Sequence, residues 1–202
     1  MSRPYLQDGS LIVRLAETSD IPALLHYHLS NRAALAPFSP RRSEQFYSAE
    51  YWQLQIALSH SHFEQARSCR LSVFEPDNRS VIGEINFSNL VPYPFYAATL
   101  GYSLDPAHWG RGRMHQALTL ALDFVFEHFN LHRVMANYLP DNQRSARLLE
   151  RLGFEREGLA RDYLLIDGVW RDHVLTALTR RGWSAHDGQR ELIENGNGGC
   201  QT

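Results

Sequence analysis

Apolar residues recur at helical spacing along the segment 113–129 of the chain. Residues three and four apart lie on one face of an α-helix, so this pattern predicts a long amphipathic helix. The preceding residues, 100–104, favour a strand that ends at Asp105-Pro106, a dipeptide typical of turns. A strand, a short loop and a long helix are therefore expected in that order. The apolar face of the helix consists of Met114, Ala117, Leu118, Ala121, Val125 and Phe129.

Other apolar segments alternate with turn residues and predict further strands and helices. Alternating apolar and polar positions favour strands, whereas a period of three to four favours helices. The predicted strands are 11–15, 71–74, 81–90, 95–104, 132–139, 159–166 and 169–179. The further predicted helices are a first one from about 21, a second over 43–65 and a last one over 142–152 that Gly153 closes. Apolar residues spread evenly over the second helix, so we expect it to be buried on two sides or to line a groove.

Connections between these segments indicate how the strands pair. Short turns join the three strands between 71 and 104, so an antiparallel meander is expected, and Gly83 would permit a bulge within it. Strand 132–139 follows a crossover helix, which favours a parallel neighbour. Asp167-Gly168 between two apolar runs is a strong hairpin signal. The result is an α/β (α+β) fold with a central mixed sheet of about six to seven strands and helices on both faces.

Composition limits the classes of protein that the chain can represent. With 202 residues, of which 44% are hydrophobic and 21% charged, the chain fits one soluble globular domain. A net charge of −2 gives no electrostatic basis for binding nucleic acid. No segment has the length of a membrane span or the pattern of a signal peptide, so we expect a cytoplasmic protein. We expect one domain over 1–182 and a flexible C-terminal tail over 183–202, where small and polar residues predominate.

Histidines and cysteines do not form a recognisable metal or disulfide pattern. The chain has ten histidines, but only His26-x-His28 and His60-x-His62 are close pairs, with no cysteine or carboxylate cluster beside them. Residues two apart do not share a helix face. Two cysteines offer no disulfide framework. We therefore expect no metal site.

The loop before the long helix has the composition of a phosphate-binding turn. A helix start exposes unpaired N–H groups and the positive end of the helix dipole, which together attract anions. Gly110 and Gly112 allow the backbone to approach a ligand, and Arg111 and Arg113 add donors that suit phosphate oxygens. A dinucleotide fingerprint is not complete here, since Met114 stands where a third glycine would be sought, and the Gly-Lys-Ser/Thr of a Walker loop is missing.

The stretches 99–114 and 142–154 resemble the GNAT superfamily of N-acetyltransferases. The acyl-CoA signature of that family is a Gln/Arg-x-x-Gly-x-Gly/Ala turn between a strand and a helix. Here Gly112 matches, Trp109 stands where Gln or Arg is common, and Met114 replaces the final Gly or Ala.

A longer match lies downstream, where the segments 133–158 and 162–178 are similar to the RimJ-type ribosomal-protein-alanine N-acetyltransferases. The resemblance covers roughly residues 10–178. It implies the GNAT fold, in which the two parallel strands at the end of the meander splay apart.

The same resemblance implies acetyl-CoA as cosubstrate and a site between the splayed strands. Main-chain groups there would contact the pantetheine arm, and a backbone N–H would polarise the thioester carbonyl and stabilise the oxyanion. Asn142 and Ser145, in an Asn-x-x-Ser pattern, match family residues near the arm and the sulfur, and Asn142 is equally suited to cap a helix. The implied cofactor-binding residues are Tyr102, Ser103, Leu104, Trp109, Gly110, Arg111, Gly112, Arg113, Met114, Asn142 and Ser145.

Acid–base residues are less well indicated. Many GNAT enzymes protonate the departing thiolate with a tyrosine in the helix after the Asn142 position, but Leu149 occupies that place here. Ser145 is therefore the candidate general acid, as the RimJ-type resemblance implies. Glu84 is the candidate general base, ahead of Asp162 and Asp172. The candidate substrate-binding residues are Asn86, Tyr163, Trp170 and His173, and hairpin packing is the alternative role of the last three.

The resemblance implies transfer of an acetyl group to the N-terminal α-amino group of a protein, most specifically the N-terminal alanine of a small-subunit ribosomal protein. An α-amino group has a pKa of about 7.7–8.0 and a lysine amine one of about 10.4, so a weak base suffices for the former. The expected partner is that ribosomal protein, with possible ribosome association, in a monomer or homodimer. Two alternatives stay open: a GNAT enzyme acting on a small amine or antibiotic, and a non-catalytic acyl-CoA-binding module.

Overall fold

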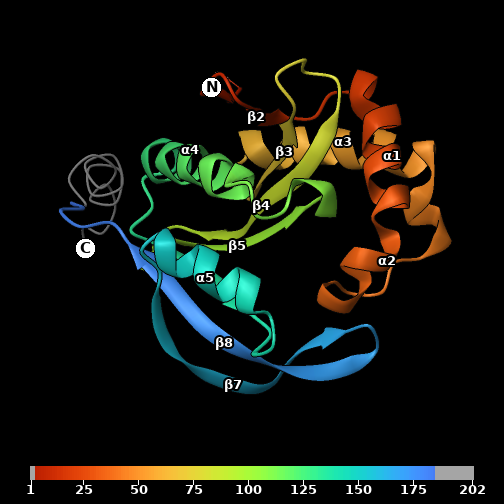
Figure 1. Ribbon diagram of the computed structural model, residues 1–202. Helices are drawn as coiled ribbons and strands as arrows, with labels where there is room; N and C mark the ends of the chain where they lie inside the picture. Colours follow the sequence, from red (N-terminus) through yellow and green to blue (C-terminus); the bar gives the residue numbers. More distant parts are fainter. Residues whose placement is uncertain (1–2, 185–202) are drawn as a thin grey trace, which may run out of the picture.

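The computed structural model describes residues 3–184, which form one eight-stranded sheet with helices on both faces (Figure 1). All neighbouring strands are antiparallel except β5 and β6, which are parallel. In order across the sheet the strands are β1 (Tyr5–Gln7), β2 (Ile12–Leu15), β3 (Cys69–Phe74), β4 (Val81–Val91), β5 (Ala97–Leu104), β6 (Arg133–Tyr138), β8 (Val169–Thr179) and β7 (Glu155–Ile166).

The helices divide between the two faces of the sheet. Their bounds are α1 (Ile21–Ser30), α2 (Arg32–Leu35), α3 (Ala49–Glu64), α4 (Arg113–His128) and α5 (Gln143–Arg151). The apolar stripes of α4 and α5 pack with Ile85 and Phe87 of β4 in the main core, so we call this side the α4 face. Leu24 of α1 and Trp52 of α3 pack with Phe74 in a second core on the other side, the α1 face.

Strands β5 and β6 pair over only part of their length. Their register runs from Ala97 opposite Arg133 to Leu100 opposite Ala136, and the ladder stops there. Each strand keeps its outer partner, because β5 stays on β4 as far as Leu104 and β6 stays on β8 as far as its end. The two facing edges beyond Leu100 therefore lack a strand partner, and their N–H and C=O groups must bond elsewhere. The predicted parallel pair and its splay are confirmed.

Two element predictions need correction. The sheet has eight strands instead of six to seven, because the three residues of β1 pair with β2 at the edge. Three residues are too few to show the alternation of apolar and polar positions that predicts a strand. Helix α3 is not buried on two sides, but the alternative prediction holds, because Tyr51 and Gln55 of this helix line a cavity described below. The buried residues of α3, Trp52, Ile56 and Phe63, form one stripe, whereas Leu54 and Leu58 are 59% and 40% exposed.

Local turn chemistry agrees with the sequence patterns. Asp167 and Gly168 have φ values of 46° and 81°, as a two-residue hairpin turn with positive φ requires. Gly153 ends α5 with φ of 84°. Trp183, placed in the expected tail, donates a hydrogen bond from Nε1 to the carbonyl of Asn130 at 3.1 Å, and the remaining tail residues 185–202 lie outside the described part. Within residues 3–184, no helix is both long enough and apolar enough to cross a membrane.

Gly83 lies beside the bulge between β3 and β4, as predicted, but its main constraint is close packing. A Cβ at this position would lie 2.7 Å from the backbone oxygen of Ser103. We expect Gly83→Ala to lower the free energy of unfolding by about 1–3 kcal/mol, because neither strand can move without disturbing the ladder. Urea unfolding measures the change. Gly158→Ala is the control, since nothing lies within 4 Å of its Cβ position, and equal losses in both variants would contradict the argument.

Candidate active site

A cavity of about 460 Å³ lies where β5 and β6 separate, and residues from both faces of the sheet line it. Neighbouring residues of a strand point to opposite faces. The Tyr102 hydroxyl accordingly meets Ser145 of α5 on the α4 face, whereas the Ser103 hydroxyl accepts a hydrogen bond from Tyr27 of α1 at 2.8 Å. Glu84 also lines the cavity, from the α1 face. This gap cavity is therefore open to groups arriving from either side of the sheet.

Two further cavities continue the gap cavity toward the start of α4. One of about 130 Å³ shares Tyr102 and Ser145 with the gap cavity. It shares Trp109 and Met114 with a third cavity, of about 450 Å³, beside the first turn of α4. One groove thus joins the two predicted features, the splayed strands and the phosphate-binding turn.

The turn before α4 has the backbone expected of an anion site. Gly110 and Gly112 have φ values of 73° and 76°, which L side chains rarely adopt. A Cβ at either position would have nothing within 4 Å apart from its own chain neighbours. Helix α4 starts directly after Gly112, so its first N–H groups have no partner within the helix. The open space beside these groups is the third cavity of the groove.

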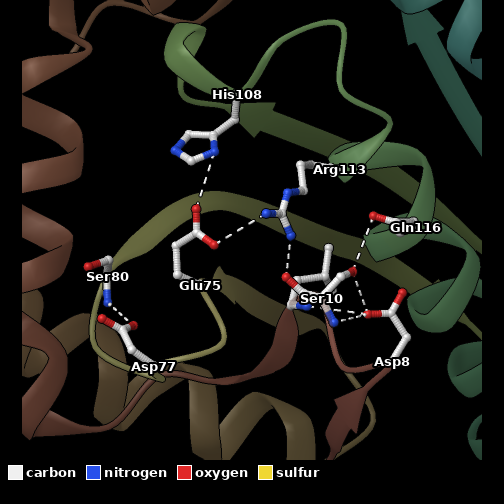
Figure 2. Close-up of polar contacts among 9 residues, drawn as sticks. Asp8, Ser10, Glu75, Asp77, Ser80, His108, Arg113 and Gln116 are labelled. Atoms are coloured by element: carbon white, nitrogen blue, oxygen red, sulfur yellow. Dashed lines mark hydrogen bonds and ion pairs between the residues drawn. The ribbon is translucent and has the colours of Figure 1, made fainter.

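Arg113 lines the third cavity and also contacts protein groups on its other side. Figure 2 shows its guanidinium between Glu75, 3.6 Å away, and the carbonyl of Ser10, to which it donates a hydrogen bond. The other oxygen of Glu75 lies 3.4 Å from Nδ1 of His108. Arg113 lines the groove but ties the turn to the end of β3 and to the loop before β2, while Arg111 is exposed.

Three arginines of α5 supply positive charge that the sequence interpretation missed. Arg144, Arg147 and Arg151 line the third cavity. Their spacing of three and four residues places them on one helix face, and this spacing was the available signal. The guanidinium of Arg144 lies 3.5 Å over the ring of Trp109. The indole N–H of Trp109 donates to the carbonyl of Leu104 at 3.0 Å, so Trp109 connects the turn to the end of β5.

The side chains of Tyr102 and Ser145 contact each other where the gap cavity meets the cavity of about 130 Å³. Their hydroxyl oxygens are 2.5 Å apart. Burial raises the pKa of Tyr102 to about 12, against a smaller opposing effect of the Ser145 hydrogen bond. Asn142 accepts the backbone N–H of Ser145 at 3.1 Å, so it caps α5 and also lines the groove.

Glu84 is held between two basic side chains on the α1 face. One carboxylate oxygen lies 3.0 Å from Nη2 of Arg70 and the other 3.2 Å from Nε2 of His28. Burial alone would raise the pKa of Glu84, but Arg70 and His28 outweigh burial and lower this pKa to about 2. The charge of Arg70 is the strongest influence that lowers the pKa of Glu84, followed by the contact with His28. Glu84 is therefore a buried, ionised hydrogen-bond acceptor and a weak base.

The other predicted site residues occupy different positions. Asn86 and His173 line the gap cavity. The Tyr163 hydroxyl accepts a hydrogen bond from Asn137 at 3.2 Å, and its ring lies 5.7 Å from that of His173. Trp170 is 59% exposed and lies outside the lining of the gap cavity.

A further opening of about 220 Å³ meets the gap cavity on the α1 face. Glu84 and Ser103 line both spaces. The opening is bordered by His28 of α1, by Phe46 and by Asp167 of the β7–β8 turn. These residues come from distant segments, so no local pattern could have identified them. Within residues 3–184 no group of three or more side chains has the arrangement of a metal site.

Comparison with known proteins decides the family. The family model for the acetyltransferase (GNAT) domain matches residues 10–155. The chain belongs to the GNAT acetyltransferase family. It is accordingly an N-acetyltransferase, and enzymes of this family use acetyl-CoA. The predicted family, fold and enzyme class are confirmed.

Individual relatives match over nearly the whole length. The ribosomal protein uS5-alanine N-acetyltransferase of Escherichia coli is 45% identical over 179 residues, which cover 89% of this chain and 92% of that protein. A crystal structure of ribosomal-protein-S5-alanine acetyltransferase from Vibrio fischeri superposes with a TM-score of 0.86 at 35% identity, covering 90% and 99% of the two chains. Mycobacterium smegmatis RimJ in complex with CoA-disulfide shares the fold, with a TM-score of 0.80 at 24% identity over 96% and 94%.

Proposed function

We propose that this GNAT enzyme transfers the acetyl group of acetyl-CoA to the N-terminal alanine of a small-subunit ribosomal protein. The observation that carries the proposal is the gap cavity, which residues of both sheet faces line. The groove on the α4 face and the opening on the α1 face converge there. Donor and acceptor can therefore approach from opposite sides and meet between the strands. The alanine acceptor and the identity of that protein, uS5, follow from the names of the similar enzymes.

The groove on the α4 face fits the chemistry of acetyl-CoA. The unpaired N–H groups at the start of α4 and the arginines of α5 suit a pyrophosphate. The free edges of β5 and β6 offer N–H and C=O groups to the amides of a pantetheine arm. A thioester held in this way would end beside Ser145. Backbone N–H groups at the end of β5 would then stabilise the oxyanion.

The opening on the α1 face fits an amine. Glu84 is ionised and retains lone pairs that can accept a hydrogen bond from the attacking amine. Its low pKa makes it a weak base, which matters little for an α-amine with a pKa of about 7.7–8.0. Because a thioester is already activated, orientation of the two groups supplies much of the rate, roughly 7–11 kcal/mol in well-oriented systems. Ser145 is the group that donates a proton to the departing sulfur.

The test is a panel of acceptors incubated with acetyl-CoA and analysed by mass spectrometry. We expect one acetyl group on a peptide with the uS5 N-terminus, less on the same peptide with a bulky first residue, and none on the N-terminally blocked peptide carrying an internal lysine. Spermidine belongs in the panel, because a relative 24% identical is the spermidine N(1)-acetyltransferase of Vibrio cholerae. Acetylation of spermidine without acetylation of the alanine peptide would replace the proposal by a small-amine function.

A further inference from the structure

Two hydroxyl groups form a direct pair where the groove enters the gap. Tyr102 comes from β5 and Ser145 from the first turn of α5, 43 residues apart in the chain, and their oxygens are 2.5 Å apart. Both residues line the gap cavity and the cavity next to it. The Ser145 backbone is held by Asn142, so the serine has a fixed position relative to the strand. The neighbouring hydroxyl on β5, that of Ser103, faces the opposite side and accepts a hydrogen bond from Tyr27.

Acetyl transfer requires a proton for the departing sulfur on the α4 face of the sheet. When the carbon–sulfur bond breaks, the sulfur leaves with the electron pair and needs a proton, while the proton lost by the amine is released on the α1 face. A serine alcohol is a very weak acid, and a lone serine that gave up its proton would be left as an alkoxide. A phenol is a better proton source than an alcohol, even with the pKa of Tyr102 raised to about 12 by burial.

We propose that Tyr102 and Ser145 act as one proton relay to the departing sulfur, with Tyr102 as the source of the proton. This inference rests on the proposed function. As the carbon–sulfur bond breaks, Ser145 gives its hydroxyl proton to the sulfur and takes the hydroxyl proton of Tyr102. The carbon–nitrogen bond forms in the same reaction, and the amine releases one proton to solvent. One proton from solvent restores Tyr102, so protons and charge balance over a turnover.

The surroundings of Tyr102 keep its hydroxyl protonated before the reaction. The pKa of Tyr102 lies at about 12 through burial, so the phenol is protonated throughout the neutral range. The hydroxyl of Tyr102 has Ser145 as its hydrogen-bond partner, and Ser145 retains its own proton for the ligand side when the phenol donates to it. Leu149, one turn further along α5, is 1% exposed, so its side chain belongs to the core and takes no part in the relay.

The test compares Tyr102→Phe, Ser145→Ala and the double variant, with acetyl-CoA and the alanine peptide. We expect each single variant to lower kcat by on the order of tenfold to fiftyfold while KM for acetyl-CoA changes little, since the lost step belongs to chemistry. The double variant should be no slower than the slower single variant, because one relay is lost only once. Multiplying losses would show independent roles and overturn the relay.

Tyr27→Phe is the matched control, because it removes another buried tyrosine hydroxyl that bonds a serine. The solvent kinetic isotope effect, which is the ratio of the single-turnover rates in H₂O and D₂O, should be smaller in Tyr102→Phe than in the wild type. It should keep the wild-type value in Tyr27→Phe. Ser145→Thr keeps a hydroxyl and should recover most of the rate lost in Ser145→Ala. An unchanged kcat in a folded Tyr102→Phe variant overturns the relay alone, whereas a wild-type enzyme inactive on alanine peptides overturns the proposed function.

Discussion

Replacing Glu84 by glutamine is expected to slow acetyl transfer to an alanine-starting peptide by on the order of 10²–10³-fold. Glu84 is the carboxylate that lines both the gap cavity and the opening on the α1 face. Glutamine keeps the size of the side chain but removes the negative charge that attracts and orients the amine. It also leaves Arg70 without its counter-charge and changes the contact with His28. Steady-state kinetics with varied peptide should show most of the loss in kcat/KM for the peptide.

A loss of folded enzyme must be separated from a loss of chemistry, because breaking a buried ion pair is itself destabilising. The pair Arg14–Asp20 provides the control: it is similarly buried, with a distance of 2.7 Å, and lies on another part of the α1 face. Asp20→Asn should lower the stability without lowering turnover per folded molecule. Equal turnover losses in Asp20→Asn and Glu84→Gln would mean that Glu84 has no role beyond structure.

The same carboxylate predicts how stability depends on pH. Its pKa is lowered from 4.5 to about 2 in the folded protein, so it contributes stability above pH 4.5 that is lost as the pH falls toward 2. The shift corresponds to on the order of 3 kcal/mol. Urea unfolding of the wild type and of Glu84→Gln between pH 5 and about 2 should show a steeper decline in the wild type. Parallel declines would mean that Arg70 and His28 do not hold the carboxylate as the distances indicate.

Local patterns predicted the elements that local chemistry determines. The apolar stripe of α4, the Asp167-Gly168 turn and the glycine that ends α5 each depend on residues close in sequence, and all are present. The strand splay came from family resemblance, because no local pattern encodes where a ladder stops. Strand β1 was missed since three residues carry too little alternation.

The side-chain partners within the site could not be predicted in the same way. Glu84 was selected as a candidate base, but its low pKa depends on Arg70 from β3 and His28 from α1, which only the folded sheet brings together. Tyr102 was expected to act through its main chain, and its hydroxyl meets Ser145 because of the face on which β5 presents it. Arg113 was predicted to bind a phosphate from its place in the turn, but the sequence did not indicate that Glu75, a carboxylate distant in the chain, lies 3.6 Å from it.

Gly112→Val is expected to raise the KM for acetyl-CoA by on the order of a hundredfold, which corresponds to the roughly 3 kcal/mol that hydrogen bonds to a charged group contribute. The glycine has φ of 76°, and the space beside its Cβ position is free of protein atoms. A branched side chain would fill that space and keep a phosphate away from the first N–H groups of α4. Isothermal titration with CoA gives the corresponding loss of affinity directly.

Backbone strain is the competing explanation, since valine is unfavourable at positive φ wherever it occurs. Gly9 separates the two effects, because its φ of 86° is similar and nothing lies within 4 Å of its Cβ position, yet it lies outside the lining of the third cavity. Gly9→Val should share the loss of stability and keep the wild-type affinity for CoA. If both variants bind CoA as the wild type does, the phosphate does not sit at the start of α4. A pyrophosphate bound elsewhere would not direct the thioester from that turn into the gap between β5 and β6.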